Sequence, residues 1–233
     1  GQEAPAPESF NRSSILASYR SEIVGVRQFL TDKGLLTVPA DIGDLVPVEV
    51  PVFMRALMPG IAMEPAAPFE TPYPGDRTLD PAQRRIVLQG TFYVRPIPDP
   101  LMPADRQRYY ADMLHHSFRG GVVHEGFPGH HLQLSVANRL IDPVRRAQQC
   151  ASFAEGWALY CEELMQRNHV TDDPWARVNT LRGVRFRACR VIVDAKLQRN
   201  EMTASQAVAF LRDNAGADSL SASGEVGRYC HEP

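Results

Sequence analysis

The stretch that decides the fold is VVHEGFPGHHLQ, residues 122–133, which places three histidines and one glutamate within eight residues. The histidines are His124, His130 and His131, and Glu125 directly follows the first of them. In metallohydrolases, two histidines on one helix bind Zn²⁺, and the glutamate after the first histidine is the general base that activates water. The residue types in this stretch therefore predict a zinc site with Glu125 as the base.

The spacing of the histidines departs from the usual one, in which the second follows the first by four residues. Here that position holds Pro128, and His130 and His131 come six and seven residues after His124. On an ideal helix these offsets are about 9 and 10.5 Å along the axis, whereas two nitrogens on one Zn²⁺ lie within about 3.5 Å of each other. An unbroken helix therefore cannot bring either histidine to the metal of His124.

Pro128 predicts the interruption that such a site requires. Proline lacks a backbone N–H, and its ring clashes with the carbonyl four residues earlier, which here belongs to His124. The residue before a proline is also disfavoured in the α region, and Gly129 tolerates any backbone conformation. We therefore expect a local bulge at residues 126–129 that brings His124 and His130 to one metal.

A third ligand is expected from SFAEGWALYCEEL, residues 152–164, which has a helical pattern. Glu155 and Glu162 are seven residues apart and share one face of this helix with apolar side chains. A carboxylate in such surroundings is costly to bury unless it binds a cation or hydrogen-bond donors. Either glutamate can therefore be the ligand while the other supports the site. From the residues alone this choice stays open, as does the choice between His130 and His131.

The composition of the whole chain is that of an ordinary globular protein. Its 233 residues carry 25 Lys+Arg and 27 Asp+Glu, a formal net charge of −2, with 44% hydrophobic and 22% charged residues. This balance argues against disorder and against nucleic acid as a partner. No apolar run reaches the roughly 18–20 residues of a membrane span. The four cysteines lie in helical patterns, so we expect buried free thiols rather than disulfides.

The prolines divide the chain, because most of the 19 lie at or before Pro103. Residues 37–105 are Pro-rich and contain two strand patterns, whereas residues 106–233 have helical periodicity. The predicted fold is mainly α with a small edge β-sheet, comprising a flexible lead at residues 1–12 and a single region at 13–233.

The individual elements follow from the same periodicities. The strands are expected at residues 46–54, where Val48, Val50 and Val52 share one side, and at 86–94. The helices are expected at 13–36, 105–118, 119–141, 148–168, 174–199, 203–214 and from Ser219 onward.

The motifs HEGFPGHHLQ and FAEGWALYCEEL together resemble the bacterial zincin-like proteins grouped as domain of unknown function 885. That family carries HE-x-x-PGHHLQ and F-x-EGWALY-x-E. The resemblance extends to YRSEIVGVRQFL, GTFYV, RACRVIVDAKLQ and EVGRY, so it spans nearly the whole chain. It implies a zincin metallopeptidase fold, related to the thermolysin-like and angiotensin-converting-enzyme-like peptidases.

The resemblance also implies roles for individual residues. In the related peptidases the second ligand follows a glycine and the third stands in an F-x-E sequence, which match His130 and Glu155. The implied Zn²⁺ ligands are therefore His124, His130 and Glu155, with Glu125 as the general base. His131 and Glu162 are implied to support the ligands and are the alternatives to them. Tyr229 or Arg228 is implied to stabilise the negatively charged oxygen (the oxyanion) that forms during hydrolysis.

The chain departs from the family pattern in two places. The family's VD-x-GLH segment reads VDAKLQ here, with Lys196 and Gln198 in place of Gly and His. The family also continues beyond the RY of residues 228–229 with a PGQALSY-type stretch and has a long N-terminal half that this sequence lacks. We therefore expect a piece of a larger protein, truncated at both ends.

These features predict a zinc-dependent hydrolase, with a peptide or another small amide as its substrate. We expect the GTFYV strand to pair with an extended peptide at the sheet edge. The alternatives are a catalytically inactive zincin-shaped binding or scaffold protein, for which the Gln198 departure and the truncated cleft argue, and a metal-dependent esterase. Exported relatives are common in the resembling family, which favours a periplasmic or secreted location. The oligomeric state stays open.

Overall fold

The computed structural model describes residues 12–55, 61–69, 80, 88–96, 118–170, 173–217 and 219–231. These residues are mainly helical and include one small sheet. Residue contacts divide the chain into two compact units, residues 1–172 and 173–233. All but the last residue of the expected lead at 1–12, and most of the expected helix at 105–118, lie outside the described residues. The division into a lead and a single region stays a prediction.

The first unit begins with α1 (Arg12–Lys33), close to the helix expected at 13–36. Its apolar side chains recur every three or four residues, which produces one buried stripe of Ile15, Tyr19, Ile23, Val26 and Leu30. The helix ends before Gly34, whose φ of +60° is a left-handed conformation that glycine adopts readily.

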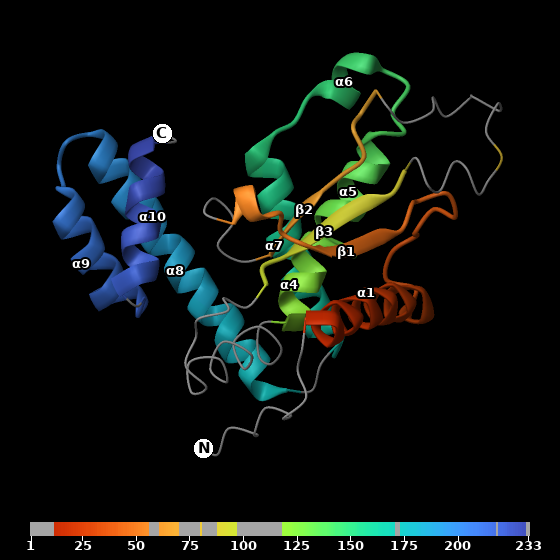
Figure 1. The fold of residues 1–233 in the computed structure, drawn as a ribbon, viewed down its shortest axis with the longest axis horizontal. Helices are drawn as coiled ribbons and strands as arrows, with labels where there is room; N and C mark the ends of the chain where they lie inside the picture. The colour runs from red at the N-terminus through yellow and green to blue at the C-terminus, as the bar shows by residue number, and fades with distance from the viewer. Residues whose placement is uncertain are drawn as a thin grey trace. The chain divides into compact units, whose positions relative to one another are not determined.

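The sheet contains β1 (Leu45–Glu49), β2 (Ile61–Glu64) and β3 (Gly90–Val94), in the order β1-β3-β2. β1 is parallel to β3, with Leu45 opposite Gly90, and β2 is antiparallel to it, with Ile61 opposite Val94. Figure 1 shows β3 between its two neighbours. β1 is an edge strand, as Pro47 predicts.

Two expectations about the strands are wrong. The GTFYV strand is β3, and since both of its sides already pair with β1 and β2, it has no free edge for an extended peptide. β1 is also shorter than expected, because a 3₁₀-helix (Val52–Met54) follows it. The strand buries Leu45 and Pro47. Of the three valines expected on one side, Val48 is partly buried, Val50 is buried and Val52 is 76% exposed.

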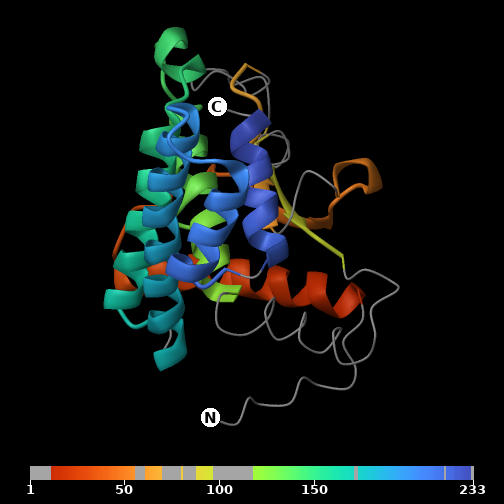
Figure 2. The ribbon, with the colours of Figure 1, turned by 90° about the vertical axis from the view of Figure 1, so that its left-hand side faces the viewer.

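Four helices complete the described part of the first unit: α4 (Phe118–Glu125), α5 (His130–Ala137), α6 (Pro143–Ala147) and α7 (Ala151–Arg167). α4 and α5 pack on β2, and α7 packs on α4 and α5. The views in Figures 1 and 2 agree that α4 and α5 lie between the sheet and α7. The core is shared by α1, the sheet, α4, α5 and α7, and this packing fixes the helices that carry the histidines and glutamates.

The second unit contains α8 (Pro174–Gln198), α9 (Ala204–Ala215) and α10 (Ser219–His231), which lie side by side in both views (Figures 1 and 2). Its core joins Val193 of α8, Leu211 of α9 and Val226 of α10. Asp173 caps α8 and is followed by Pro174, whose missing N–H costs nothing at this position.

Two further expectations concern the membrane and the cysteines. Within the described ranges, no helix combines the length and the apolar character needed to cross a bilayer. All four cysteines are free thiols, as expected. Cys161 and Cys189 are buried, but Cys150 and Cys230 are exposed, so the expectation of burial holds for only two.

Candidate metal centre

The histidine-containing stretch 122–133 is divided between two short helices. α4 ends at Glu125 and α5 begins at His130, so the helix is interrupted at residues 126–129, as Pro128 predicts. The peptide bond between Phe127 and Pro128 is cis. The interruption places His124 near the end of one helix and His130 at the start of the next.

Gly129 allows the turn to close onto α4. Its N–H donates to the carbonyl oxygen of Val123 at 3.0 Å, and a Cβ on Gly129 would lie 1.9 Å from the carbonyl oxygen of His124. A side chain therefore cannot be accommodated here. The sequence indicated backbone freedom at Gly129, and the structure adds a lack of space as the stronger reason for glycine.

His124, His130 and Glu155 meet at one point. The Nε2 atom of His124 lies 3.4 Å from Oε2 of Glu155, and the Nε2 atom of His130 lies 3.5 Å from Oε1 of the same carboxylate. The two imidazole rings are perpendicular, with centroids 4.8 Å apart. One donor atom from each of the three residues lies within 4.8 Å of the others.

This arrangement fits a tetrahedral Zn²⁺ site. Bonds of about 2.0–2.2 Å to nitrogen and oxygen place two tetrahedral ligand atoms about 3.3–3.5 Å apart. The distances from Glu155 to the two histidines, 3.4 and 3.5 Å, are close to that range, although each involves a different carboxylate oxygen, and the three donor atoms lie within 4.8 Å of one another. The side chain of Glu155 is 62% exposed, whereas those of His124 and His130 are 14% and 11% exposed. The site is therefore open on the side of the carboxylate.

Glu162 orients His124. The Nδ1–H of His124 donates to Oε1 of Glu162 at 2.7 Å, which leaves Nε2 directed toward Glu155. A histidine that binds a metal commonly donates its other N–H to a carboxylate in this way, which fixes the ring and its tautomer. Among the described residues, the buried Nδ1 of His130 has no hydrogen-bond partner, so no carboxylate orients this ring as Glu162 orients His124.

The charges of these groups are strongly coupled. Burial lowers the pKa of His124, but hydrogen bonds with Glu155 and Glu162 and the charge of Glu125 outweigh this effect and raise the pKa to about 9. Hydrogen bonds with His124 and His130 hold the pKa of Glu155 well below its usual range. The carboxylates of Glu125, Glu155 and Glu162 thus surround the imidazole of His124, which stays protonated at neutral pH. A bound metal ion would replace the proton on Nε2 of this imidazole.

Glu125 lies beside the same cluster. Its carboxyl interacts electrostatically with His124, His130 and Glu155 and accepts a backbone hydrogen bond from Met63 of β2. Burial raises the pKa of Glu125, and the charges of the two histidines oppose that rise. A carboxylate so placed can accept a proton from a water or a ligand held at the cluster.

His131 does not belong to the cluster. It is fully buried, its Nε2 lies 2.9 Å from the carbonyl oxygen of Gly43, and burial lowers its pKa. The ring packs so closely against β3 that a Cβ on Gly90 would lie 2.6 Å from Nδ1 of His131. His131 therefore connects α5 to the sheet, and of the two alternative ligands, the structure brings Glu162 but not His131 into contact with the cluster.

Trp157 fixes α7 to the interrupted stretch. Its Nε1–H donates to the carbonyl oxygen of Pro128 at 2.8 Å. Since Trp157 lies two residues after Glu155, this bond holds the glutamate against the turn that precedes His130. The carbonyl oxygen of Pro128 is available to accept this bond because the helix is interrupted there.

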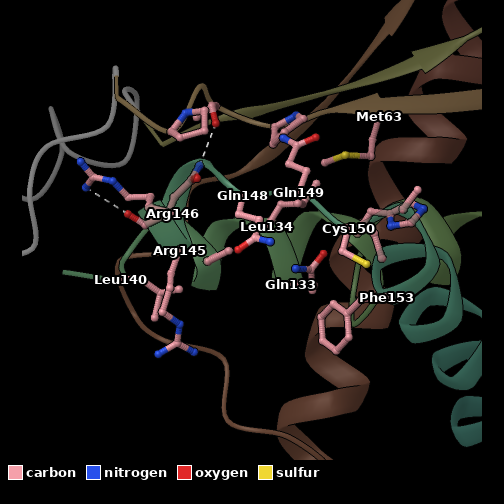
Figure 3. Close-up of a pocket in the computed structure, with 18 of the residues that line it drawn as sticks. Met63, Gln133, Leu134, Leu140, Arg145, Arg146, Gln148, Gln149, Cys150 and Phe153 are labelled. Atoms are coloured by element: carbon pink, nitrogen blue, oxygen red, sulfur yellow. Dashed lines mark hydrogen bonds between the residues drawn. The ribbon is translucent and has the colours of Figure 1, made fainter. Parts of the chain in front are cut away.

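A cavity of about 760 Å³ extends from the cluster between β2, α5, α6 and α7. His130 and Glu155 both line it, together with apolar and polar side chains from all four elements. Figure 3 shows Met63, Cys150 and Phe153 at one end, and Leu140, Arg145 and Arg146 at the other. The candidate metal site is therefore continuous with a volume of the size of a small-molecule pocket.

Tyr229 and Arg228 belong to α10 in the second unit. The hydroxyl of Tyr229 donates to Oε2 of Glu225 at 2.5 Å and accepts from Nε of Arg190 at 2.6 Å, while Arg228 pairs with Glu225 at 3.1 Å. The amide of Gln198 donates to the carbonyl oxygen of Tyr229 at 2.9 Å. This last bond gives Gln198 a structural role within the second unit, where it connects α8 to α10. Gln198 is the residue that stands in place of the histidine of the VD-x-GLH pattern. The suggested role of Tyr229 or Arg228 at an oxyanion stays a prediction.

Comparisons with known proteins support the family resemblance of the sequence over nearly the whole chain. The sequence profile of a family described as bacterial protein of unknown function (DUF885) matches residues 2–233. No curated protein matches the chain.

Two solved structures share the fold. One is described as a "putative lipoprotein of unknown function" from Shewanella oneidensis, with a TM-score of 0.69 and 22% identity over 94% of this chain and 36% of that one. The other is a "putative lipoprotein" from Colwellia psychrerythraea, with a TM-score of 0.66 and 21% identity over 94% and 33%. The chain thus spans about a third of the length of these structures.

Proposed function

This chain belongs to the DUF885 family of bacterial proteins of unknown function, and from that premise we propose that it is a zinc-dependent hydrolase with a zincin-type centre. We propose a peptide as its substrate. The observation that carries the proposal is the meeting of His124, His130 and Glu155, whose donor atoms lie within 4.8 Å of one another and are of the types that bind Zn²⁺. A glutamate adjacent to the first histidine adds the proton acceptor that hydrolysis needs.

Each residue would have one task in this reaction. His124, His130 and Glu155 would hold the metal, and Glu162 would keep the Nε2 of His124 directed at it. The bound Zn²⁺ would supply positive charge that acidifies water and polarises a carbonyl group. Glu125 would accept the proton of the water and deliver it to the leaving amine.

The family also bears on where the protein works. The descriptions of both solved relatives name a lipoprotein. We propose that this protein likewise acts outside the cytoplasm. Localisation of an epitope-tagged, full-length protein by cell fractionation tests this: the tag should be recovered with the envelope or periplasm, and recovery in the cytosol would refute it.

The function is tested by combining metal analysis with a hydrolysis assay on a quenched-fluorescent peptide library. The zinc-loaded protein should contain one Zn²⁺ per chain and cleave members of the library. Glu125→Gln should keep the zinc and lose about 10²–10⁴-fold in kcat/KM, because general-base catalysis contributes that much. Glu163→Gln is the matched control, since Glu163 pairs with Arg167 on α7, and it should keep both zinc and activity.

Two results would refute the proposal. Hydrolysis by the wild type that does not exceed that of Glu125→Gln on any peptide would exclude this mechanism. Equal zinc contents of the wild type and a His124→Ala, His130→Ala double variant would exclude the metal centre.

A further inference from the structure

The cavity beside the candidate metal centre has two arginines at its far end. Arg145 and Arg146 come from α6 and line the cavity that His130 and Glu155 line at the other end (Figure 3). Nothing in the motifs of the sequence indicates this pair, because α6 is a five-residue helix outside them.

Among the described residues, the guanidinium of neither arginine is paired with a carboxylate. Nη1 of Arg146 donates to the carbonyl oxygen of Asn138 at 3.4 Å, its guanidinium lies 5.2 Å from the centre of the Phe69 ring, and its buried Nε has no acceptor. The backbone N–H of Arg145 donates to the carboxylate of Asp142 at 3.3 Å, and its guanidinium has no ion pair among the described residues. By contrast, nearby Arg139 pairs with Asp41. The end of the cavity thus carries two guanidinium groups that form no ion pair with a carboxylate of the described residues.

The separation between this charge and the metal centre follows from α5. Asn138, which accepts the bond from Arg146, comes eight residues after His130 along one continuous helical run. At 1.5 Å per residue, the two ends of the cavity are about 12 Å apart. An extended peptide advances about 3.3–3.5 Å per residue, so three to four residues span this distance.

The walls between the two ends suit a peptide chain. Met63 and Phe153 provide apolar surface at the end near the metal centre and Leu134 provides it between the ends. Gln133 and Gln148, also between the ends, provide amides that can donate to or accept from peptide groups. Binding sites for small ligands commonly combine apolar walls with a few polar groups in this way.

We propose that this cavity binds a short peptide whose carboxylate is held by Arg145 and Arg146, about three to four residues from the bond at the metal centre. The proposal rests on the proposed hydrolase function and specifies its substrate class. A guanidinium binds a carboxylate through charge-assisted, often bidentate hydrogen bonds. The carboxylate is either the C-terminus of the peptide or an acidic side chain at the same distance.

Binding is measured first, by fluorescence anisotropy with N-terminally fluorescein-labelled oligo-alanines of two to six residues. The zinc-loaded Glu125→Gln variant is used as the binding protein, so that the probes are not consumed. Probes with a free C-terminal carboxylate should bind at least tenfold tighter than their C-terminal amides, with the largest ratio at the lengths that span the cavity. An amidated probe with one Glu in place of Ala separates the two sources of the carboxylate.

Charge-removing substitutions then test the arginines. Adding Arg145→Gln and Arg146→Gln should reduce the carboxylate-to-amide ratio to about one without changing the affinity for the amide. Arg167→Gln removes an exposed arginine from the far end of α7 and should leave the ratio unchanged. Circular dichroism checks folding, and the single Arg145→Gln variant, expected to reduce the ratio in part, replaces the double variant if that unfolds.

The outcomes separate this inference from the proposed function. Equal binding of acid, amide and Glu-containing probes, or a ratio that survives both substitutions, would overturn the carboxylate site. A carboxylate preference that depends on the arginines would support it, even if the wild type cleaves no peptide, in which case only the hydrolase proposal fails. If cleavage occurs, mass spectrometry of the products should place the cut three to four residues from the carboxylate.

Discussion

Gly129 is the residue on which the approach of the two histidines depends. Its position against the carbonyl oxygen of His124 leaves no room for a side chain. Pro128 alone would interrupt the helix, but the chain returns toward α4 only because the next residue lacks a Cβ.

Gly129→Ala is expected to destabilise the protein and weaken zinc binding. The added Cβ would overlap the carbonyl oxygen of His124, and forced overlap of this kind costs about 1–3 kcal/mol. Urea unfolding and zinc titration measure the two effects. Gly120→Ala, on α4, is the matched control, because a Cβ there meets nothing within 4 Å; wild-type behaviour of Gly129→Ala would show that the turn is not tightly closed.

Glu162→Gln is expected to weaken zinc binding about 10–100-fold, because partners that orient a ligating histidine contribute that much. The substitution keeps the size of the side chain and removes the negative charge of the carboxylate whose Oε1 accepts the Nδ1–H of His124. Competition with a chromophoric chelator measures the affinity. Glu163→Gln on the same helix should leave it unchanged, and equal affinities of both variants would contradict the role of Glu162.

The cysteines are expected to differ in reactivity. Burial, together with the charge of Glu162, raises the pKa of Cys161 to about 12, so at pH 8 only about one molecule in ten thousand carries the thiolate. Exposed Cys150 and Cys230 should react with a disulfide reagent within minutes, whereas Cys161 should react only after unfolding. Peptide mass spectrometry identifies the modified residues, and rapid labelling of Cys161 in the folded protein would contradict its burial.

The residues of the candidate site were only partly predictable from the sequence. The break at residues 126–129 follows from local chemistry, since Pro128 acts on its own helix. The different roles of His130 and His131 do not follow from local chemistry. They depend on Gly43 and Gly90, which are distant in the sequence and contact the His131 ring in the folded chain.

At the scale of elements, the helices of the second half were predicted within a few residues. α7, α8 and α9 match the expected ranges 148–168, 174–199 and 203–214, because each combines an apolar periodicity with a recognisable end. β2 and α6 were not expected. β2 has four residues and exists through its pairing with β3, and α6 has five residues, too few for a periodic pattern.

The start of α9 provides a test at this scale. The side chain of Thr203 accepts from the N–H of Gln206, whose side chain accepts in return from the N–H of Thr203, which forms a capping box. Thr203→Ala should lower the free energy of unfolding by about 1 kcal/mol. Exposed Ser205→Ala is the control. Chemical denaturation followed by circular dichroism measures both, and equal stabilities of the two variants would contradict the cap.

At the scale of the whole molecule, the mainly helical class and the small sheet were predictable, but the cavity was not. Its walls come from β2, α5, α6 and α7, and two of these elements are too short to leave a pattern in the sequence. The arginines at its far end therefore became visible only once the chain was folded, whereas the histidines and glutamates carried their own motif.

The central claim is that His124, His130 and Glu155 hold one zinc ion. Anomalous diffraction from crystals of the zinc-loaded protein at the zinc absorption edge tests it most directly, with zinc content measured for His130→Ala and His131→Ala. We predict one peak bonded to Nε2 of His124, Nε2 of His130 and the carboxylate of Glu155, lost in His130→Ala and kept in His131→Ala. A peak elsewhere, no peak, or zinc that depends on His131 rather than His130 would contradict the account.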